Sequence, residues 1–281
     1  MGGGLGHYSP CVMHNRSMIE RVAQLMRRTA VQAILPRFRA LQASEVEEKS
    51  PGEHVTAADR EAEALLTSGL MALLPGSVVL GEEAASAQPD MVQRLSGEAD
   101  LWIVDPLDGT SNFVEGKPIF SVMVALMRRG ETVASWMLDP LTDTLAVAKK
   151  DGGAWLGGQR ITTPRAVTED LYLRGAVLTR FLPPELRLSI EARSQNVGGI
   201  LPGLRCAGHE YPAIATGAQN FVLFWRTEPW DHVPGALFIT EAGGHVARLD
   251  GTPYVPLDGG KGLLVAQNRE TWQSVARCLL G

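Results

Sequence analysis

Cysteine is scarce in this sequence, and its three occurrences form no pattern. Cys11, Cys206 and Cys278 are odd in number and widely separated along the 281 residues. A framework of disulfide bonds is therefore not expected, and a reducing compartment, the cytoplasm, is the default expectation.

Long apolar runs and an excess of basic residues are also absent. No apolar stretch reaches the roughly 20 residues that a membrane-spanning helix needs. Residues 1–10 are rich in glycine and lack a basic segment followed by an apolar one, so we expect a flexible tail and no secretory signal. The formal net charge of −5 means that neither nucleic acid nor a membrane is expected as a partner.

The residues that are present are typical of a well-packed globular protein. Hydrophobic residues make up 45% and charged residues 20% of the chain. Apolar residues at helical spacing predict helices over 18–35 and 57–74, and Pro36 should end or kink the first. The polar stretch 41–51 reads as a mobile loop. Further elements are predicted as antiparallel hairpins built from 120–127, 132–138 and 144–148, a linker over 162–170, and then alternating strands and helices.

The chain is organised around residues 102–113. An apolar run leads to Asp105 and Asp108, and Pro106 fixes the backbone between the two acids. Gly109 permits a tight turn, and Thr110 then resembles the start of a helix, whose free N–H groups can bind an anion. Carboxylates for a hard cation beside N–H donors for a phosphate suit metal-assisted phosphoryl hydrolysis. Taken alone, such a segment is more often only a turn.

Other acidic residues lie near predicted helix and strand ends. Thr56 and Asp59 fit a capping pair, Glu82 follows a short strand over 78–80, and Asp231 begins an apolar helix over 230–241. A capping or solvated role explains each acid by itself. The alternative is that Glu82 and Asp105, which both follow strands, converge on one cleft.

Together these segments resemble the inositol monophosphatase family of magnesium-dependent, lithium-sensitive phosphatases, over nearly the whole chain. The resemblance rests on four blocks in the family's order: Val55-Thr56-Ala57-Ala58-Asp59, Gly81-Glu82-Glu83, Asp105-Pro106-Leu107-Asp108-Gly109-Thr110, and Trp230-Asp231 with Glu241-Ala242-Gly243-Gly244. The third block is highly specific, and the others gain weight from their order.

The resemblance implies an α/β (α+β) fold, the layered α/β/α/β/α sandwich of the inositol monophosphatase and sugar phosphatase type, normally a homodimer. It implies an N-terminal half, 12–161, with most metal ligands, and a C-terminal half, 162–281, with Asp231 and the substrate wall. Two or three Mg²⁺ ions would be held by Glu82, Asp105, the carbonyl of Leu107, Asp108 and Asp231.

The resemblance also implies which residues act on the substrate. Glu82, Asp59 and Thr110 would be catalytic and orient the attacking water. The N–H groups of Gly109 and Thr110 would bind the phosphate. No protein nucleophile is required, which agrees with the lack of a Ser-His-Asp or Cys-His signature.

The sequence departs from the family where the substrate would bind. Inositol-preferring members have an acidic residue seven positions before the last metal aspartate, and this chain has Phe224 there. Their upstream Gly-Ser-Ala-Ala-like run is here Arg205-Cys206-Ala207-Gly208, followed by His209. Phe224, Cys206 and His209 are therefore the candidate substrate-binding residues. Packing in the core explains Phe224 equally well, and packing or capping explains His209 better.

Three hypotheses of function follow. The first is magnesium-dependent hydrolysis of a small phosphate monoester, with inositol monophosphate as the family default and histidinol phosphate, a sugar phosphate or a 3′-phosphorylated nucleotide as alternatives. The second is an inactive relative that binds metal and phosphate as a regulatory module; the intact acid set argues against it. The third, a two-carboxylate glycosidase, would need no phosphate-binding turn at Gly109 and Thr110.

Overall fold

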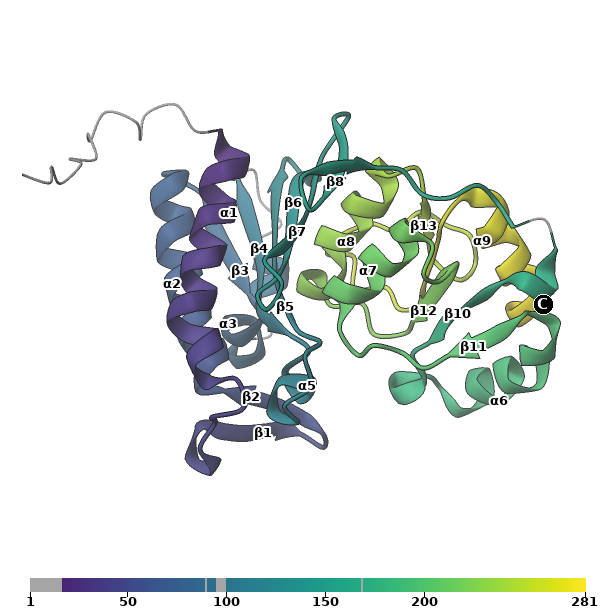
Figure 1. Cartoon of the computed structure of the whole chain (residues 1–281), viewed down its shortest axis with the longest axis horizontal. Helices are drawn as coiled ribbons and strands as arrows, with labels where there is room; N and C mark the ends of the chain where they lie inside the picture. Colours follow the sequence, from purple (N-terminus) through teal and green to yellow (C-terminus); the bar gives the residue numbers. More distant parts are fainter. Residues whose placement is uncertain (1–16, 89, 95–99, 168) are drawn as a thin grey trace, which may run out of the picture.

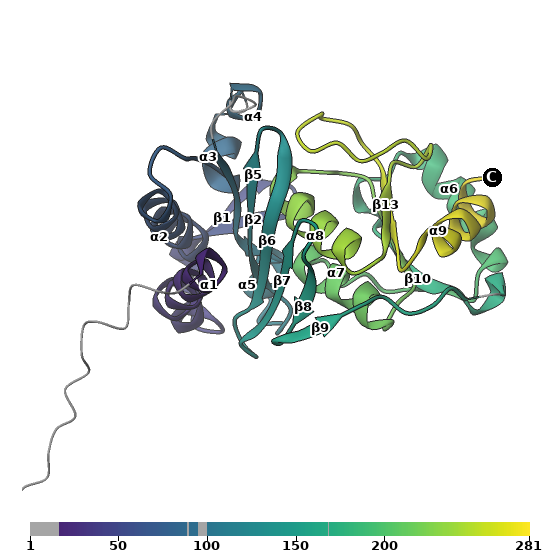
Figure 2. The same ribbon diagram turned by 90° about the horizontal axis from the view of Figure 1, so that it is seen from above.

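The chain folds into stacked layers of helices and sheets. The computed structural model describes residues 17–88, 90–94, 100–167 and 169–281; the predicted N-terminal tail and Cys11 lie outside them. Of the described cysteines, Cys206 and Cys278 are free. Figure 1 and Figure 2 show a helix, sheet, helix, sheet, helix order, so the predicted α/β/α/β/α sandwich is confirmed.

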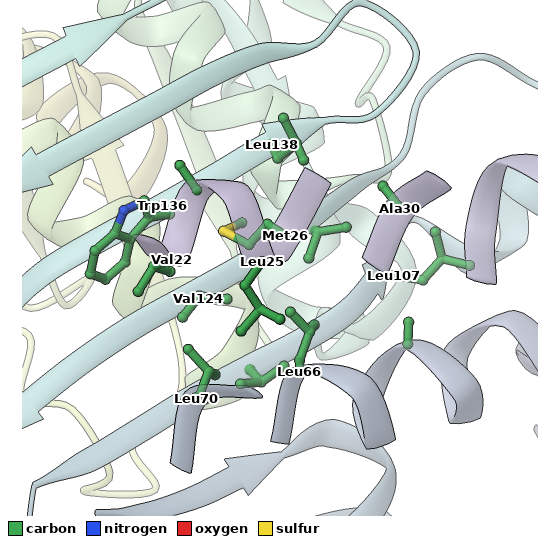
Figure 3. Close-up of a cluster of buried hydrophobic side chains, with 14 of the residues drawn as sticks. Val22, Leu25, Met26, Ala30, Leu66, Leu70, Leu107, Val124, Trp136 and Leu138 are labelled. Atoms are coloured by element: carbon green, nitrogen blue, oxygen red, sulfur yellow. The ribbon is translucent and has the colours of Figure 1, made fainter. Parts of the chain in front are cut away.

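The first layer consists of α1 (Met18–Thr29) and α2 (Ala57–Leu73). Ser17 and Glu20 form a capping box at the start of α1, and the helix continues as a π-turn (Ala30–Ile34) and a 3-10 turn (Leu35–Arg37). Pro36 thus lies where the helix ends, as predicted. Apolar side chains of both helices pack on the first sheet in one cluster, of which Trp136 is a member, as Figure 3 shows. Burial of this face fixes the sheet on which the central acids lie.

The first sheet carries the central motif. Its described strands lie in sequence order, and β3 is parallel to β4 whereas all later neighbours are antiparallel. The predicted antiparallel hairpins are therefore confirmed. The strands are β3 (Val78–Gly81), β4 (Leu101–Asp108), β5 (Ser121–Arg128), β6 (Glu131–Asp139), β7 (Thr144–Lys149), β8 (Gly153–Leu156) and β9 (Gln159–Ile161).

The prediction of a mobile loop over 41–51 was wrong. Residues Ala43–Glu45 form a 3-10 turn, and β1 (Val46–Ser50) pairs with β2 (Glu53–Thr56) as an antiparallel hairpin. Four of the five β1 residues are exposed, so the strand lacks the alternation of apolar and polar residues that would have revealed it. Backbone pairing and the ion pair between Glu47 and Arg60 hold it in place.

The middle layer is made of α7 (Ala207–Thr216) and α8 (Pro229–Glu241). Ten of the thirteen residues of α8 are buried, and the helix packs on β5, β6 and β7. A core that includes Tyr211, Phe224 and Phe238 joins both helices to the two sheets. Because α8 contacts both halves of the chain, its first turn lies where they meet.

The second sheet has the strand order β11-β10-β12-β14-β13. β10 is parallel to β11 and β12, and β14 is antiparallel to β12 and β13. The 3-10 turn Asp170–Tyr172 precedes β10, which begins at Arg174. The strands are β10 (Arg174–Val177), β11 (Gly199–Leu201), β12 (Phe221–Phe224), β13 (His245–Ala247) and β14 (Leu263–Ala266).

The outer layer consists of α6 (Pro184–Arg193) and α9 (Arg269–Val275), which continues as a π-turn over Ala276–Leu280. Shorter helices occur at α3 (Glu82–Ala87), α4 (Met91–Arg94) and α5 (Thr110–Val114). The boundary predicted at residues 161 and 162 falls between the two sheets, and the status of the halves as domains stays a prediction. Among the described residues, no helix has the length and apolar character needed to span a membrane.

Candidate active site

A cavity of about 700 Å³ is bordered by the β1–β2 hairpin, the ends of β4, β10 and β12, and the first turn of α8. This volume suits a small organic ligand. Asp59 and His209 are not among its lining residues. The predicted site residues that do line it are Glu82, Asp105, Leu107, Asp108, Gly109, Thr110, Cys206, Phe224 and Asp231.

Three aspartates lie together in this cavity. Oxygen atoms of Asp105, Asp108 and Asp231 all fall within 4.8 Å of one another. Residues three apart on a regular strand point to opposite faces. In β4, however, Asp105 pairs with Met123 and Asp108 with Ser121, so β4 has one extra residue between them. This bulge turns both carboxylates toward one side, where the first turn of α8 adds Asp231.

The carboxyl groups of this cluster have raised pKa values. Burial, followed by the charges of Glu82, Asp108 and Asp231, raises the pKa of Asp105 well above its ordinary range. Burial and the charge of Asp108 raise the pKa of Asp231 to about 7. Buried like charges therefore destabilise the fully ionised cluster, and a bound cation would relieve that repulsion.

The donors fit magnesium. The cluster offers only carboxylate oxygens, to which the Leu107 carbonyl in the same cavity wall can be added, and hard divalent cations prefer such ligands. The thiol of Cys206 lies 3.0 Å from Oδ2 of Asp108. Burial raises the pKa of this thiol well above its usual value, so it donates a hydrogen bond and stays protonated.

Glu82 lies outside the group of three, at the start of α3. Its Oε1 atom is 3.3 Å from Nζ of Lys49, which lies 2.6 Å from Glu83. Burial raises the pKa of Glu82 well above the ordinary value, whereas the charge of Lys49 lowers it. Glu82 is close enough to the cluster to raise the pKa of Asp105. Its role as a ligand stays a prediction.

Gly109 supplies the turn between the acids and α5. Its φ angle is +85°, and a Cβ atom there would lie 2.9 Å from the carbonyl oxygen of Ile119. Glycine is therefore required both by the conformation and by the close approach. The first N–H groups of a helix have no partner within it. The first N–H groups of α5 therefore lie next to the aspartate cluster. The sequence predicts that these groups bind a phosphate.

Asp59 reaches the cavity through Thr110. Its Oδ2 accepts hydrogen bonds from the N–H and the hydroxyl of Thr56, at 2.8 and 2.6 Å, which completes the predicted capping box of α2. Its Oδ1 lies 3.0 Å from the hydroxyl oxygen of Thr110. Burial raises the pKa of Asp59 to about 6. Capping and contact with the cavity lining thus coexist in one carboxylate.

The start of α7 supports Asp108 in a way that the sequence did not reveal. The N–H of Gly208 donates to Oδ2 of Asp108 at 2.7 Å, and the hydroxyl of Ser121 donates to the same oxygen at 3.3 Å. A Cβ atom at Gly208 would lie 1.9 Å from the Ser121 hydroxyl oxygen, so no other residue fits there without rearrangement. Backbone N–H donors leave no signature in a sequence, so this contact needed the structure.

The three candidate substrate residues differ in position. Cys206 and Phe224 line the cavity, and Phe224 is only 6% exposed. Its ring stacks on Tyr211 with centroids 5.7 Å apart and lies edge-on to His232 at 4.6 Å. Nε2 of His209 donates to the carbonyl of Phe120 at 3.1 Å. A role of His209 in substrate binding therefore gains no support from its position and stays a prediction.

Comparisons with known proteins agree with this geometry. The inositol-1-monophosphatase of Rhizobium meliloti is 34% identical over 227 residues, covering 79% of this chain and 82% of that protein. The Nus factor SuhB of Pseudomonas aeruginosa is 31% identical over 258 residues, covering 88% and 90%. The solved structure of the suhB protein from Bartonella henselae superimposes with a TM-score of 0.76 at 26% identity, covering 93% and 97%.

The profile of the family adds the last comparison. It is described as the inositol monophosphatase family and matches residues 15–279, which include the hairpin, the aspartate cluster and the whole second sheet. With the layered fold and the acids in one cavity, this match shows that the chain belongs to the inositol monophosphatase family.

Proposed function

We propose that this protein hydrolyses a small-molecule phosphate monoester with two or three Mg²⁺ ions as cofactors. The observation that carries the proposal is the convergence of Asp105, Asp108 and Asp231 within 4.8 Å, beside the turn at Gly109. These three residues, with Glu82 and the Leu107 carbonyl, would hold the ions. When bound, the ions lower the pKa of water and stabilise charge on the leaving oxygen.

The chain's own groups supply the remaining steps. The N–H groups of Gly109 and Thr110 bind the phosphate oxygens at the start of α5. The Thr110 hydroxyl, held 3.0 Å from Asp59, orients the attacking water opposite the leaving group. With a pKa of about 6, Asp59 is able to take up a proton through Thr110 near neutral pH.

The substrate wall favours a compound other than inositol monophosphate. Phe224 has no oxygen that accepts hydrogen bonds from ring hydroxyls, and it is packed between Tyr211 and His232. A polyol site without acceptors loses discrimination. Inositol monophosphate remains the family default. Histidinol phosphate, a sugar phosphate and a 3′-phosphorylated nucleotide are the alternatives.

A second candidate function is that of an inactive regulatory protein that binds metal and phosphate. The observation in its favour is that a 31% identical relative is named a Nus factor. Its acid cluster would then bind ions without turnover. Detectable hydrolysis of any phosphate monoester would support the phosphatase and exclude the inactive protein.

Metal removal tests the main proposal. We expect no release of phosphate after chelation and recovery on addition of Mg²⁺, whereas Ca²⁺ should inhibit because its looser coordination does not hold in-line geometry. Asp143→Asn, at an exposed aspartate paired with Arg27, is the matched control and should keep normal activity. Full activity in chelator would refute the proposal.

The proposal also covers the oligomeric state of the protein and its cellular compartment. By the family pattern, we expect a homodimer in the cytoplasm, with no nucleic acid or membrane as a partner. Analytical ultracentrifugation of the purified protein tests the dimer, and cell fractionation tests the location.

A further inference from the structure

Three arginines line the cavity, and none has a part in the chemistry proposed above. Arg205 is paired with Glu115, whereas Arg180 and Arg226 share one aromatic ring. Arg180 lies in the 3-10 turn Thr179–Phe181 (η6) that follows β10, and Arg226 follows β12. Their guanidinium carbons lie 4.8 and 4.3 Å from the centroid of the same ring, that of Phe181. Because a cation is attracted to an aromatic face, this ring holds two positive charges together in the wall.

The charges of this pair are only partly compensated. Arg226 forms an ion pair with Glu53, whereas Arg180 has no carboxylate within ion-pair distance in the described part of the chain. Nη2 of Arg180 donates to the carbonyl of Pro51 at 2.7 Å. Each guanidinium group has five N–H donors. Among the described residues each guanidinium finds one hydrogen-bond partner, so N–H donors of both groups remain for a ligand.

The pair lies close to the predicted phosphate site. Pro51 binds Arg180, Glu53 binds Arg226, and the carbonyl of Gly52 between them accepts a hydrogen bond from the Ser111 hydroxyl at 3.3 Å. Ser111 follows Thr110 directly. Three consecutive residues span at most roughly 10 Å. One small metabolite is therefore long enough to reach from the α5 N–H groups to the arginines.

We propose that the substrate carries a second anionic group, a phosphate or a carboxylate, that Arg180 and Arg226 bind. This inference rests on the proposed function and narrows its substrate class from any phosphate monoester to bis-anionic ones. A guanidinium fork matches the oxygens of both anions and binds them by two parallel hydrogen bonds. A monoester whose remainder is uncharged, such as inositol monophosphate, leaves this contact unused.

A purely structural role is the competing explanation, because both arginines also hold the β1–β2 turn. The two roles predict different outcomes. If Arg180 only fixes the turn, its loss disturbs the neighbouring Ser111 and lowers the efficiency for all substrates by a similar factor. If it binds the second anion, the loss falls on bis-anionic substrates.

Matched substrate pairs provide the test. We would compare adenosine 3′,5′-bisphosphate with adenosine 3′-phosphate, fructose 1,6-bisphosphate with fructose 1-phosphate, and 3-phosphoglycerate with glycerol 3-phosphate. The first two pairs differ by a phosphate and the last by a carboxylate. We expect kcat/KM to be at least tenfold higher for the bis-anionic member of at least one pair. That ratio should fall at least fivefold in Arg180→Gln and be partly restored in Arg180→Lys.

The control is Arg187→Gln, which removes an exposed α6 arginine paired with Glu191 and should leave the ratio unchanged. A ratio below two for every pair, or one that survives in Arg180→Gln, overturns the inference. Calorimetric binding of the same pairs with Ca²⁺ separates it from the proposed function. Tighter binding of bis-anionic members with Ca²⁺, together with no hydrolysis of any member with Mg²⁺, would refute only the proposed function, and equal binding throughout would refute the subsite.

Discussion

The hydroxyl oxygen of Thr110 lies 3.0 Å from Oδ1 of Asp59, although 51 positions separate the two residues in the sequence. The contact joins the capping box of α2 to the first turn of α5. It places a buried carboxyl group with a pKa of about 6 one hydrogen bond away from the cavity lining.

The first prediction concerns this pair. Asp59→Asn should lower kcat by about two orders of magnitude, the lower end of what a general base contributes, because an amide cannot take up the proton. Glu20→Gln is the matched control, since Glu20 occupies the same capping-box position in α1 without lining the cavity. The rate of phosphate release at saturating substrate gives kcat for both variants. Normal turnover in Asp59→Asn would show that Asp59 only caps α2 and takes no part in the reaction.

The second prediction concerns the aspartate cluster. Asp105→Asn should lower the rate by at least roughly two orders of magnitude, comparable to the loss of one strong electrostatic stabiliser. The metal-free variant should unfold at a higher temperature than the wild type, because one of the buried like charges is removed. Calorimetry in chelator and a phosphate-release assay measure the two effects. An active variant would show that the metal assignment is wrong.

The third prediction concerns pH. A carboxyl group whose pKa is raised by folding binds more protons in the folded state than in the unfolded state, so stability falls as pH rises. The decline should begin near the ordinary pKa of aspartate, 3.8, and end near the folded values of about 6 for Asp59 and about 7 for Asp231. One pKa unit corresponds to about 1.4 kcal/mol. These two carboxyl groups should therefore make the metal-free protein less stable across this window. Burial of His232, which lowers its pKa to about 3, acts in the opposite direction.

Urea unfolding in chelator, repeated across that pH range, measures this loss. Mg²⁺ should flatten the profile, because a bound cation lowers the pKa of its carboxylate ligands. The same profile for Asp231→Asn isolates the contribution of the cluster, since His232 is unchanged in it. A profile that does not differ between this variant and the wild type would contradict the cluster's electrostatics.

The fourth prediction concerns the substrate wall. Phe224→Glu should shift preference toward inositol monophosphate, because a carboxylate accepts the hydroxyl hydrogen bonds that a phenyl ring cannot. One unmet hydroxyl costs roughly 1–3 kcal/mol, or about one to two decades in kcat/KM. The assay compares inositol monophosphate, histidinol phosphate and a nucleotide 3′-phosphate, in the wild type and the variant.

Phe224 also packs in the core, so a thermal melt must accompany this assay. Phe224→Leu is the control, since it removes the ring without adding an acceptor and should not favour inositol monophosphate. If the wild type already prefers inositol monophosphate and Phe224→Glu leaves the ranking unchanged, Phe224 is only a core residue.

The sequence was most informative where a motif is local. Asp105, Asp108 and Gly109 lie within five positions, so their spacing alone indicated carboxylates beside a turn. The layered fold followed from the resemblance, and the antiparallel hairpins followed from β-rich segments separated by turns. Strand β1 escaped detection because both of its faces are largely polar, so no apolar face marks it.

Contacts between distant segments could not be predicted from the sequence. The bulge between Asp105 and Asp108 depends on pairing with β5, and the support of Asp108 by Gly208 depends on where α7 begins. The arginine pair at Phe181 comes from two loops 46 positions apart, at residues 180 and 226. No local pattern of charge or hydrophobicity specifies that these segments meet.

The position of Asp231 in the aspartate cluster depends on how α8 packs against α7. A Cβ atom at Gly235 would lie 2.0 Å from the ring of Tyr211, so α7 and α8 touch at a point where even one methyl group forces them apart. Asp231 is carried by the first turn of the same rigid helix, one turn away. If the cluster binds a cation as proposed, its affinity should depend on how closely the two helices pack. A buried substitution at this contact would then weaken the binding of an ion that it does not touch.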